Sequence, residues 1–188
     1  LASAILGAVV GFVGVLTARG LREQAAFAVL ASTGTLLIAV SGWREGMLAA
    51  GLYYLVQAVL AGALLFLVAD VVLRRRGQYG DALVPSPRFA DHNGAGLLYL
   101  AAAIAVVGLP PLAAFVGKLL ILDASFGAPN WPAIWTTILL TTFVGVIGFS
   151  RSGSTLFWKA ALRADPVAAP ARARTDFLVP TALLALLA

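Results

Sequence analysis

Lys118 has the residue type and the setting of a buried group that can exchange a proton. It lies in the apolar run VVGLPPLAAFVGKLLIL, residues 106–122. A charged lysine inside a bilayer costs about 2.5–3.5 kcal/mol on insertion scales. The run continues to Phe126, about 12 Å further along a helix, which is beyond the reach of the side chain. Lys118 therefore needs a hydrated cavity or a carboxylate partner on a neighbouring helix. Because burial disfavours the charged form of a lysine, we predict that Lys118 takes up and releases a proton; a purely structural ion pair is the alternative.

The residues just before Lys118 predict a broken helix. Gly108, Pro110 and Pro111 stand in the segment GLPP. Proline removes a backbone donor and clashes with the preceding turn, and it pushes the residue before it toward an extended conformation. We expect two half-helices joined by an irregular segment at 108–111. Irregular backbone at membrane depth is tolerated where it is packed in protein or lines water, and broken helices facing a midplane site recur in ion transporters.

Other polar side chains inside apolar runs are candidates for a hydrated pathway to Lys118. They are Gln57, Tyr53, Ser32, Thr137 and Thr141. A structural role is open for each, since amides bond across membrane helices and most membrane hydroxyls bond their own backbone. Asp123 is a candidate for the outer mouth of the pathway or for an interfacial cap. Asp70 precedes Arg74 by four residues, which predicts an ion pair at the membrane edge.

The composition indicates a membrane protein and excludes most kinds of enzyme site. Of the 188 residues, 61% are hydrophobic and 11% charged, whereas a soluble domain carries about a quarter charged residues. There is no cysteine and a single histidine, His92, and no phosphate-binding or nucleophile motif is present. We expect no metal, no cofactor and no catalytic site. Basic membrane loops explain the net charge of +5 better than binding to nucleic acid does.

Six apolar runs of sufficient length predict an all-α protein with about six transmembrane helices in one membrane domain over residues 1–188. The runs are residues 1–18, 25–41, 47–73, 96–126, 133–149 and 177–188. The fourth is too long for one straight helix and contains the predicted break. The last run is clipped by the end of the sequence, and the first begins inside apolar sequence without a methionine. These features predict a piece of a longer chain.

The distribution of basic residues predicts the orientation of the helices. If the loop 19–24 is cytoplasmic, loops 74–94 and 150–176 lie on the same side. The three loops together hold 11 of the 13 lysines and arginines. The opposite side holds Arg44, and Lys118 is inside the membrane. This asymmetry follows the positive-inside rule. Within 150–176 we expect a short amphipathic interfacial helix, GSTLFWKAALRA, followed by a linker.

Two segments resemble a family of antiporter-like membrane subunits. GLPPLAAFVGKLLIL and LYYLVQAVLAGALLFLVAD are similar to the subunits of Mrp-type cation/proton antiporters and of respiratory complex I, and most closely to the D subunit of the Mrp complex. The resemblance implies the second half of a fourteen-helix fold, the ninth to the fourteenth helix. It also implies that Lys118 is the titratable residue of an outward proton half-channel.

The resemblance further implies a multi-pass subunit in the cell inner or plasma membrane that exchanges protons for Na+ or another monovalent cation. Its partners would be the other membrane subunits of the complex and the lipid bilayer. The chain departs from the family pattern at Gln57 and Ser32, where related subunits carry a histidine. Neither replacement titrates near neutral pH, so a proton path here would need water held by these side chains.

Two other interpretations stay open from the sequence. A proton-pumping subunit of complex I or of a membrane hydrogenase would use the same lysine but draw on redox energy. A non-transporting membrane scaffold would use Lys118 only as a structural ion pair.

Overall fold

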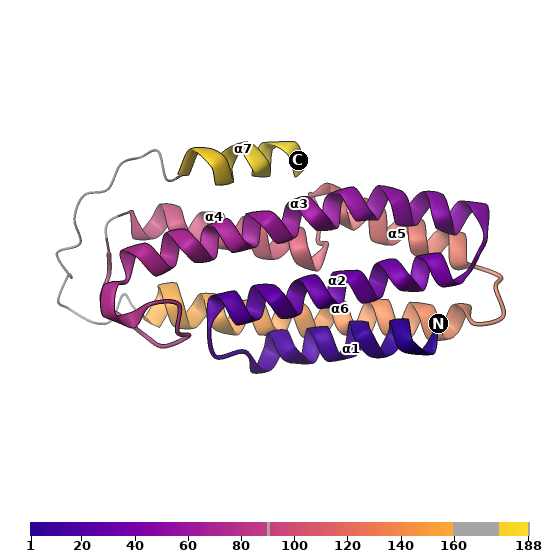
Figure 1. The fold of residues 1–188 in the computed structure, drawn as a ribbon, viewed down its shortest axis with the longest axis horizontal. Coiled ribbons are helices and arrows are strands. Elements are labelled where there is room, and N and C mark those ends of the chain that lie inside the picture. The colour runs from indigo at the N-terminus through magenta and orange to yellow at the C-terminus, as the bar shows by residue number, and fades with distance from the viewer. Residues whose placement is uncertain (90, 160–176, 188) are drawn as a thin grey trace.

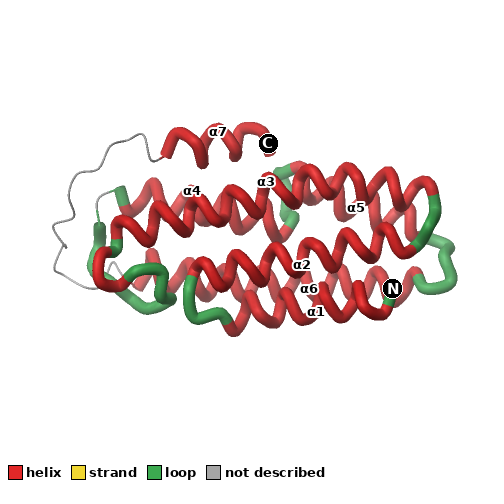
Figure 2. The backbone as a smooth tube through the Cα atoms, in the orientation of Figure 1, coloured by secondary structure: helices red, strands yellow, loops and turns green. Residues whose placement is uncertain are grey.

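The computed structural model describes residues 1–89, 91–159 and 177–187, and every regular element in these ranges is helical (Figure 1; Figure 2). In chain order they are α1 (Ala2–Thr17), α2 (Leu21–Ser41), α3 (Glu45–Arg75), η1 (Gly77–Tyr79), α4 (His92–Val107), α5 (Ala113–Ser125), α6 (Trp131–Gly153), η2 (Ser154–Trp158) and α7 (Leu178–Leu187). The 3₁₀ turn η1 lies in the loop after α3, and η2 is a π-helical continuation of α6.

Successive long helices run in alternating directions along one axis, and α5 continues in the direction of α4 (Figure 1). The ends of α1, α3 and α6 therefore lie at the same end of the bundle as the starts of α2, α4 and α7. This is the end to which the charge distribution assigns the cytoplasm. Helix α1 packs on α2 and α6, while α3 packs on α2, α4 and α5.

Small residues bring α1 and α2 into close contact. A Cβ atom added at Gly11 would clash with the backbone of Ala31, and one added at Gly34 would clash with the backbone of Ala8. Without a hydrophobic driving force between helices in lipid, close van der Waals contact between small residues is a main source of helix association. These positions therefore determine the line along which the two helices meet.

The helix boundaries extend or shift those predicted from apolar runs. Helix α2 begins at Leu21 rather than at 25, α3 spans Glu45–Arg75 rather than 47–73, and α6 begins at Trp131 rather than at 133. Polar residues such as Glu45 continue a helix into the interface, where hydropathy no longer marks it. The predicted ion pair between Asp70 and Arg74 is present at 2.7 Å.

An all-α membrane architecture is confirmed, and the predicted count of six crossings is approximate. Three segments are long and apolar enough to cross a bilayer, Leu21–Ser41, Glu45–Arg75 and Trp131–Trp158, while α1, α4 and α7 are shorter apolar helices. The predicted interfacial helix after 150 begins as a direct extension of α6, because α6 and η2 continue to Trp158. The rest of that segment and the linker, residues 160–176, lie outside the described residues.

The loop between α3 and α4 lies at the end of the bundle where α2 and α4 begin, and it is held by a buried arginine. Arg76 is 2% exposed, and its guanidinium donates to the carbonyls of Gly80, Ala82 and Val84 at 3.1, 2.6 and 2.5 Å and to Ser86 Oγ at 3.0 Å. Burial lowers the pKa of Arg76, and the charge of Asp81 opposes that shift. Backbone bonds from Leu21 to Asp81 and from Leu83 to Arg19 tie the loop to the start of α2.

Candidate functional site around Lys118

The break between α4 and α5 leaves a backbone carbonyl without a helical partner. Helix α4 ends at Val107, and Gly108 caps it in the left-handed conformation, φ 71°, with its N–H bonded to the carbonyl of Ile104. In a continuous helix the carbonyl of Val107 would accept from the N–H of residue 111. Residue 111 is proline, which has no N–H. The predicted interruption at 108–111 is thus confirmed (Figure 2), and it presents a free carbonyl at the end of a half-helix.

Lys118 donates to that carbonyl. The side chain is 4% exposed, and its Nζ lies 2.6 Å from the carbonyl oxygen of Val107 and 2.9 Å from Oγ1 of Thr142 on α6. The same nitrogen lies 5.4 Å from the ring centroid of Phe12 on α1, within the range of a cation–π contact. A carbonyl at a helix C-terminus carries the negative end of the helix dipole and favours a cation.

The charge of Lys118 has neutral partners. Within the ranges 1–89, 91–159 and 177–187, the ion pairs are Arg22–Asp70, Arg74–Asp70 and Arg75–Asp91, so no carboxylate there pairs with Lys118. This excludes the structural ion pair within the described part of the chain. Neutral oxygens stabilise an ammonium less than a carboxylate does. A charge elsewhere in the protein can therefore shift the balance between the protonated and the neutral form of Lys118.

Of the other predicted pathway residues, Ser32 and Gln57 have buried polar atoms, whereas the rest are exposed or bond their own helix. Ser32 is 8% exposed and lies within reach of the phenol of Tyr54. Gln57 is half-buried, and its Oε1 is buried without a hydrogen-bond partner among the described residues. Tyr53 is 39% exposed, and the hydrogen bonds of Thr137 and Thr141 go to carbonyls of α6 itself. Asp123 is exposed on the last turn of α5.

Two residues outside the set of predicted pathway residues lie at this site, one against Lys118 and the other against the neighbouring Gly117. Thr142, one residue beyond Thr141, supplies the hydroxyl contact to Lys118. Tyr54, rather than Tyr53, faces α5, since a Cβ at Gly117 would lie 3.1 Å from its ring. In each case the sequence contains two adjacent residues of the same type, two threonines or two tyrosines. Adjacent residues on a helix point about 100° apart, and the apolar pattern does not identify which of the two faces inward.

A second buried polar cluster lies near the start of α2 and the ends of α1 and α6. Gln24 is 1% exposed and joins α1, α2, α4 and α6: its Nε2 donates to the Val15 carbonyl at 3.1 Å and to Ser152 Oγ at 2.9 Å. Its Oε1 accepts from the hydroxyls of Tyr99 at 3.2 Å and Ser152 at 3.0 Å. The Tyr99 and Ser152 hydroxyls are 2.6 Å apart. We refer to Gln24, Tyr99 and Ser152 as the amide cluster.

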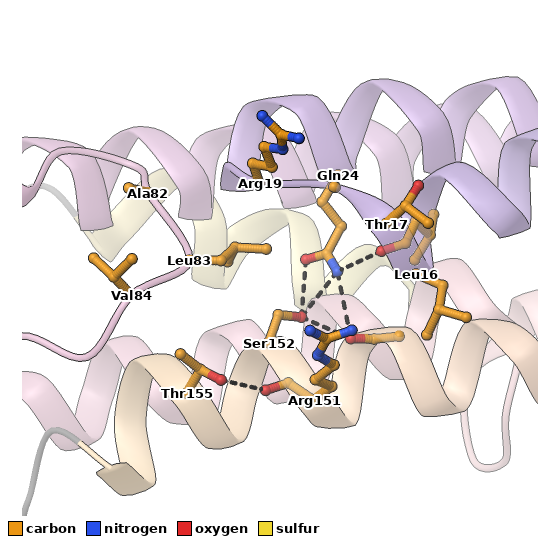
Figure 3. A pocket seen from close by; sticks show the side chains of 13 residues that line it. Leu16, Thr17, Arg19, Gln24, Ala82, Leu83, Val84, Arg151, Ser152 and Thr155 are labelled. Atoms are coloured by element: carbon orange, nitrogen blue, oxygen red, sulfur yellow. Dashed lines mark hydrogen bonds between the residues drawn. The ribbon is translucent and has the colours of Figure 1, made fainter.

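Two members of the amide cluster, Gln24 and Ser152, line a cavity of about 560 Å³ (Figure 3). The side chains of Gln24 and Ser152 point toward one another and are hydrogen-bonded, while the guanidinium of Arg19 points away from them. The loop residues Ala82, Leu83 and Val84 also line the cavity. The signal for this cluster in the sequence is weak, because Gln24 is the last residue of the polar segment REQ and resembles a loop residue.

Comparison with known proteins supports the membrane assignment. The family described as NADH:quinone oxidoreductase/Mrp antiporter, TM matches residues 1–145. The chain is 30% identical over 177 residues to the D subunit of a "Probable K(+)/H(+) antiporter" of Rhizobium meliloti (strain 1021), covering 79% of this chain and 33% of that protein. It is 24% identical to the D subunit of a Na(+)/H(+) antiporter of Bacillus subtilis (strain 168), covering 82% and 31%. An N subunit of the NADH-quinone oxidoreductase of Solidesulfovibrio magneticus is 28% identical, covering 85% and 34%.

Solved structures share the fold. A chain of respiratory complex I from Thermus thermophilus superposes with a TM-score of 0.80 at 22% identity, covering 97% of this chain and 38% of that one. A chain of the Mrp complex from Dietzia sp. DQ12-45-1b gives 0.73 at 20% identity, covering 87% and 29%.

The chain therefore spans about a third of the length of the curated relatives it matches. Its apolar helices and these relatives identify it as part of a multi-pass plasma-membrane protein. The resemblance seen in the sequence is confirmed, and the chain belongs to the NADH:quinone oxidoreductase/Mrp antiporter transmembrane family.

Proposed function

We propose that the chain is part of the D-type membrane subunit of a multisubunit antiporter that exchanges protons for Na+ or another monovalent cation. The names of the relatives in Rhizobium meliloti and Bacillus subtilis support this activity. The observation that carries the proposal is Lys118, a buried ammonium held by two neutral oxygens beside a broken helix. Its partners would be other membrane subunits of the same complex and the surrounding lipid.

The proposed mechanism is electrostatic. Protonated Lys118 donates to the Val107 carbonyl and to the Thr142 hydroxyl. After the proton leaves, the neutral amine can accept a hydrogen bond from the same hydroxyl. At an effective dielectric constant near 20, a unit charge about 6 Å away changes the energy of the protonated form by about 3 kcal/mol. A charge moving along a buried polar axis is therefore sufficient to switch the lysine between its two forms.

Two of the predicted polar residues suit a hydrated path on the α2–α3 side. Gln57 Oε1 is a buried acceptor without a partner among the described residues, and a buried polar atom of this kind commonly binds water. Ser32 is buried nearby on α2, beside Tyr54. We propose that water held by these side chains replaces the titrating histidine of related subunits. Asp123, exposed at the outer end of α5, suits the mouth of the path.

A proton-pumping subunit of complex I or of a membrane hydrogenase is the second candidate function. The relative from Solidesulfovibrio magneticus and the superposition on complex I of Thermus thermophilus favour it. The same lysine would serve, driven by redox energy. Purifying the full complex distinguishes the two, because one assembly contains small antiporter subunits and the other contains dehydrogenase and iron–sulfur subunits.

The test is cation-driven proton flux in vesicles that contain the assembled complex. Lys118→Met keeps most of the side-chain volume without the charge, and Lys118→Arg keeps a charge that does not leave at physiological pH. Both are expected to lower flux at least about tenfold, the effect of about 1.4 kcal/mol. Lys159→Met, at the exposed end of η2, is the control. Normal flux in either Lys118 variant, with the complex intact, would leave the membrane-scaffold interpretation standing.

A further inference from the structure

A groove runs along the outer side of the contact between α4 and α6–η2. It consists of two adjoining cavities, each of about 470 Å³, that share Gly96, Leu100, Phe157 and Trp158 as lining residues. The exposed side chains of Leu100 and Trp158, 55% and 79% exposed, form its rim. The groove is therefore open at the surface of the described helices.

The inner part of the groove is apolar and has the length of one leaflet. Its walls include Ala103, Ile104, Leu109 and Val146. From Gly96 to Val107, both lining residues of α4, the helix rises about 16 Å at 1.5 Å per residue. Half of a hydrocarbon core of about 30 Å is about 15 Å. This part of the groove thus matches the depth reached by a single acyl chain.

The outer part of the groove is polar and basic. Arg88, His92 and Asn93 line it, and Lys159 follows Trp158 directly in sequence. Arg88 is exposed and belongs to no ion pair within the described ranges. Charge distribution places this end at the cytoplasmic surface, where tryptophan and basic side chains lie at the level of the headgroups.

The wall between the two parts is held in place. His92, 8% exposed, has Nε2 3.1 Å from the carbonyl oxygen of Phe157. Its ring centroid lies 5.3 Å from that of Phe157 and 4.8 Å from that of Phe89. A preformed wall lowers the cost of ordering a ligand.

We propose that this groove binds one anionic phospholipid of the cytoplasmic leaflet. One acyl chain lies between α4 and α6 as far as Val107, and the phosphate lies against Arg88. Basic pockets between transmembrane helices on the cytoplasmic side are suited to acidic headgroups. Free phosphate would leave the apolar part of the groove unfilled, and a zwitterionic lipid would bring a second cation to an end of the groove that already carries Arg88 and Lys159.

The test is native mass spectrometry of the intact complex, purified with the full-length subunit and titrated with phosphatidylglycerol or phosphatidylcholine. Arg88→Gln removes the charge at the polar end, and Leu100→Trp fills the apolar part. Each is expected to reduce bound phosphatidylglycerol about fivefold; for Arg88→Gln this is the effect of about 1 kcal/mol per basic residue near a headgroup. Arg151→Gln and Leu140→Trp, both exposed on α6 and outside the groove, are the matched controls.

Several outcomes would overturn the proposal. Loss in the Arg88 variant alone would show surface attraction without use of the groove. Loss in the Leu100 variant alone, or equal binding of both lipids, would show a site without preference for acidic headgroups. Unchanged lipid together with loss of a neighbouring subunit in the Leu100 variant would show that protein occupies the groove. Equal losses in the controls would show a general effect of surface charge or side-chain size.

Discussion

The ammonium nitrogen of Lys118 lies 2.6 Å from the carbonyl oxygen of Val107, at the point where α4 ends. Proline at 111 removes the N–H that would otherwise occupy this carbonyl. The helix break and the buried lysine are therefore one feature: the break supplies the acceptor, and the lysine satisfies the backbone group that the break leaves free.

Replacing Thr142 with valine removes the second acceptor of Lys118 at nearly constant volume. A hydrogen bond to a charged group contributes about 1.5–3 kcal/mol, so the protonated lysine loses stabilisation relative to the neutral amine. We expect the pH of half-maximal transport to move downward and flux to fall about tenfold. Thr141→Val is the control, because the Thr141 hydroxyl bonds carbonyls of its own helix. An unchanged pH profile for Thr142→Val would show that this contact does not influence the proton exchange.

Gly108→Ala tests whether the geometry of the break positions the lysine. The added Cβ would lie 3.1 Å from Cδ of Lys118, and φ at this position is +71°. Gly127→Ala has the same kind of backbone, φ +75°, with nothing within 4 Å of the Cβ. Both substitutions are expected to cost about 1–2 kcal/mol of stability, but only Gly108→Ala should lower transport. Similar flux in the two variants at matched assembly would contradict this. Thermal unfolding and vesicle flux are the measurements.

Replacing the buried Gln24 is predicted to destabilise the protein more than replacing the half-buried Gln57. Gln24→Leu leaves the Val15 carbonyl without its amide partner, and an unsatisfied buried group costs about 1–3 kcal/mol. The Tyr99 and Ser152 hydroxyls also lose the amide but keep their bonds to each other and to carbonyls of α6. The Oε1 of Gln57 lacks a partner among the described residues, so Gln57→Leu should change stability by less than about 1 kcal/mol. Thermal unfolding of the purified complex compares them. An equal loss in both variants would mean that Gln57 has a partner of equal strength in the assembly.

Arg76 is expected to hold the loop that covers the cavity beside the amide cluster. Arg76→Ala removes the donors to Gly80, Ala82, Val84 and Ser86. Amide hydrogen exchange over residues 77–86 should then rise about tenfold or more. Arg74→Ala, which breaks an exposed pair with Asp70, is a matched control, because such pairs contribute about 0–1 kcal/mol. Protection that persists in Arg76→Ala would show that the backbone bonds to Arg19 and Leu21 suffice.

The sequence was sufficient to locate the helices and the helix break, but not to identify which residues of each helix face the interior of the bundle. Apolar runs located the helices because a bilayer demands length and hydrophobicity, and GLPP located the break because proline lacks an N–H. The same logic failed at neighbouring residues. Thr142, not Thr141, reaches the lysine, and Tyr54, not Tyr53, is buried. In water a polar face would have marked the outside of each helix, but lipid-facing and core-facing positions are here both apolar.

Sequence alone determined that this chain crosses a membrane, which end carries the positive charge, and that a lysine sits beside a broken helix, since these follow from local composition and from the covalent structure of proline. Only the tertiary structure decided that Lys118 meets a carbonyl and a threonine hydroxyl rather than a carboxylate. It also decided that Gln24 is buried with Tyr99 and Ser152. These contacts join residues far apart in the chain, and they are set by how closely α1, α4 and α6 pack.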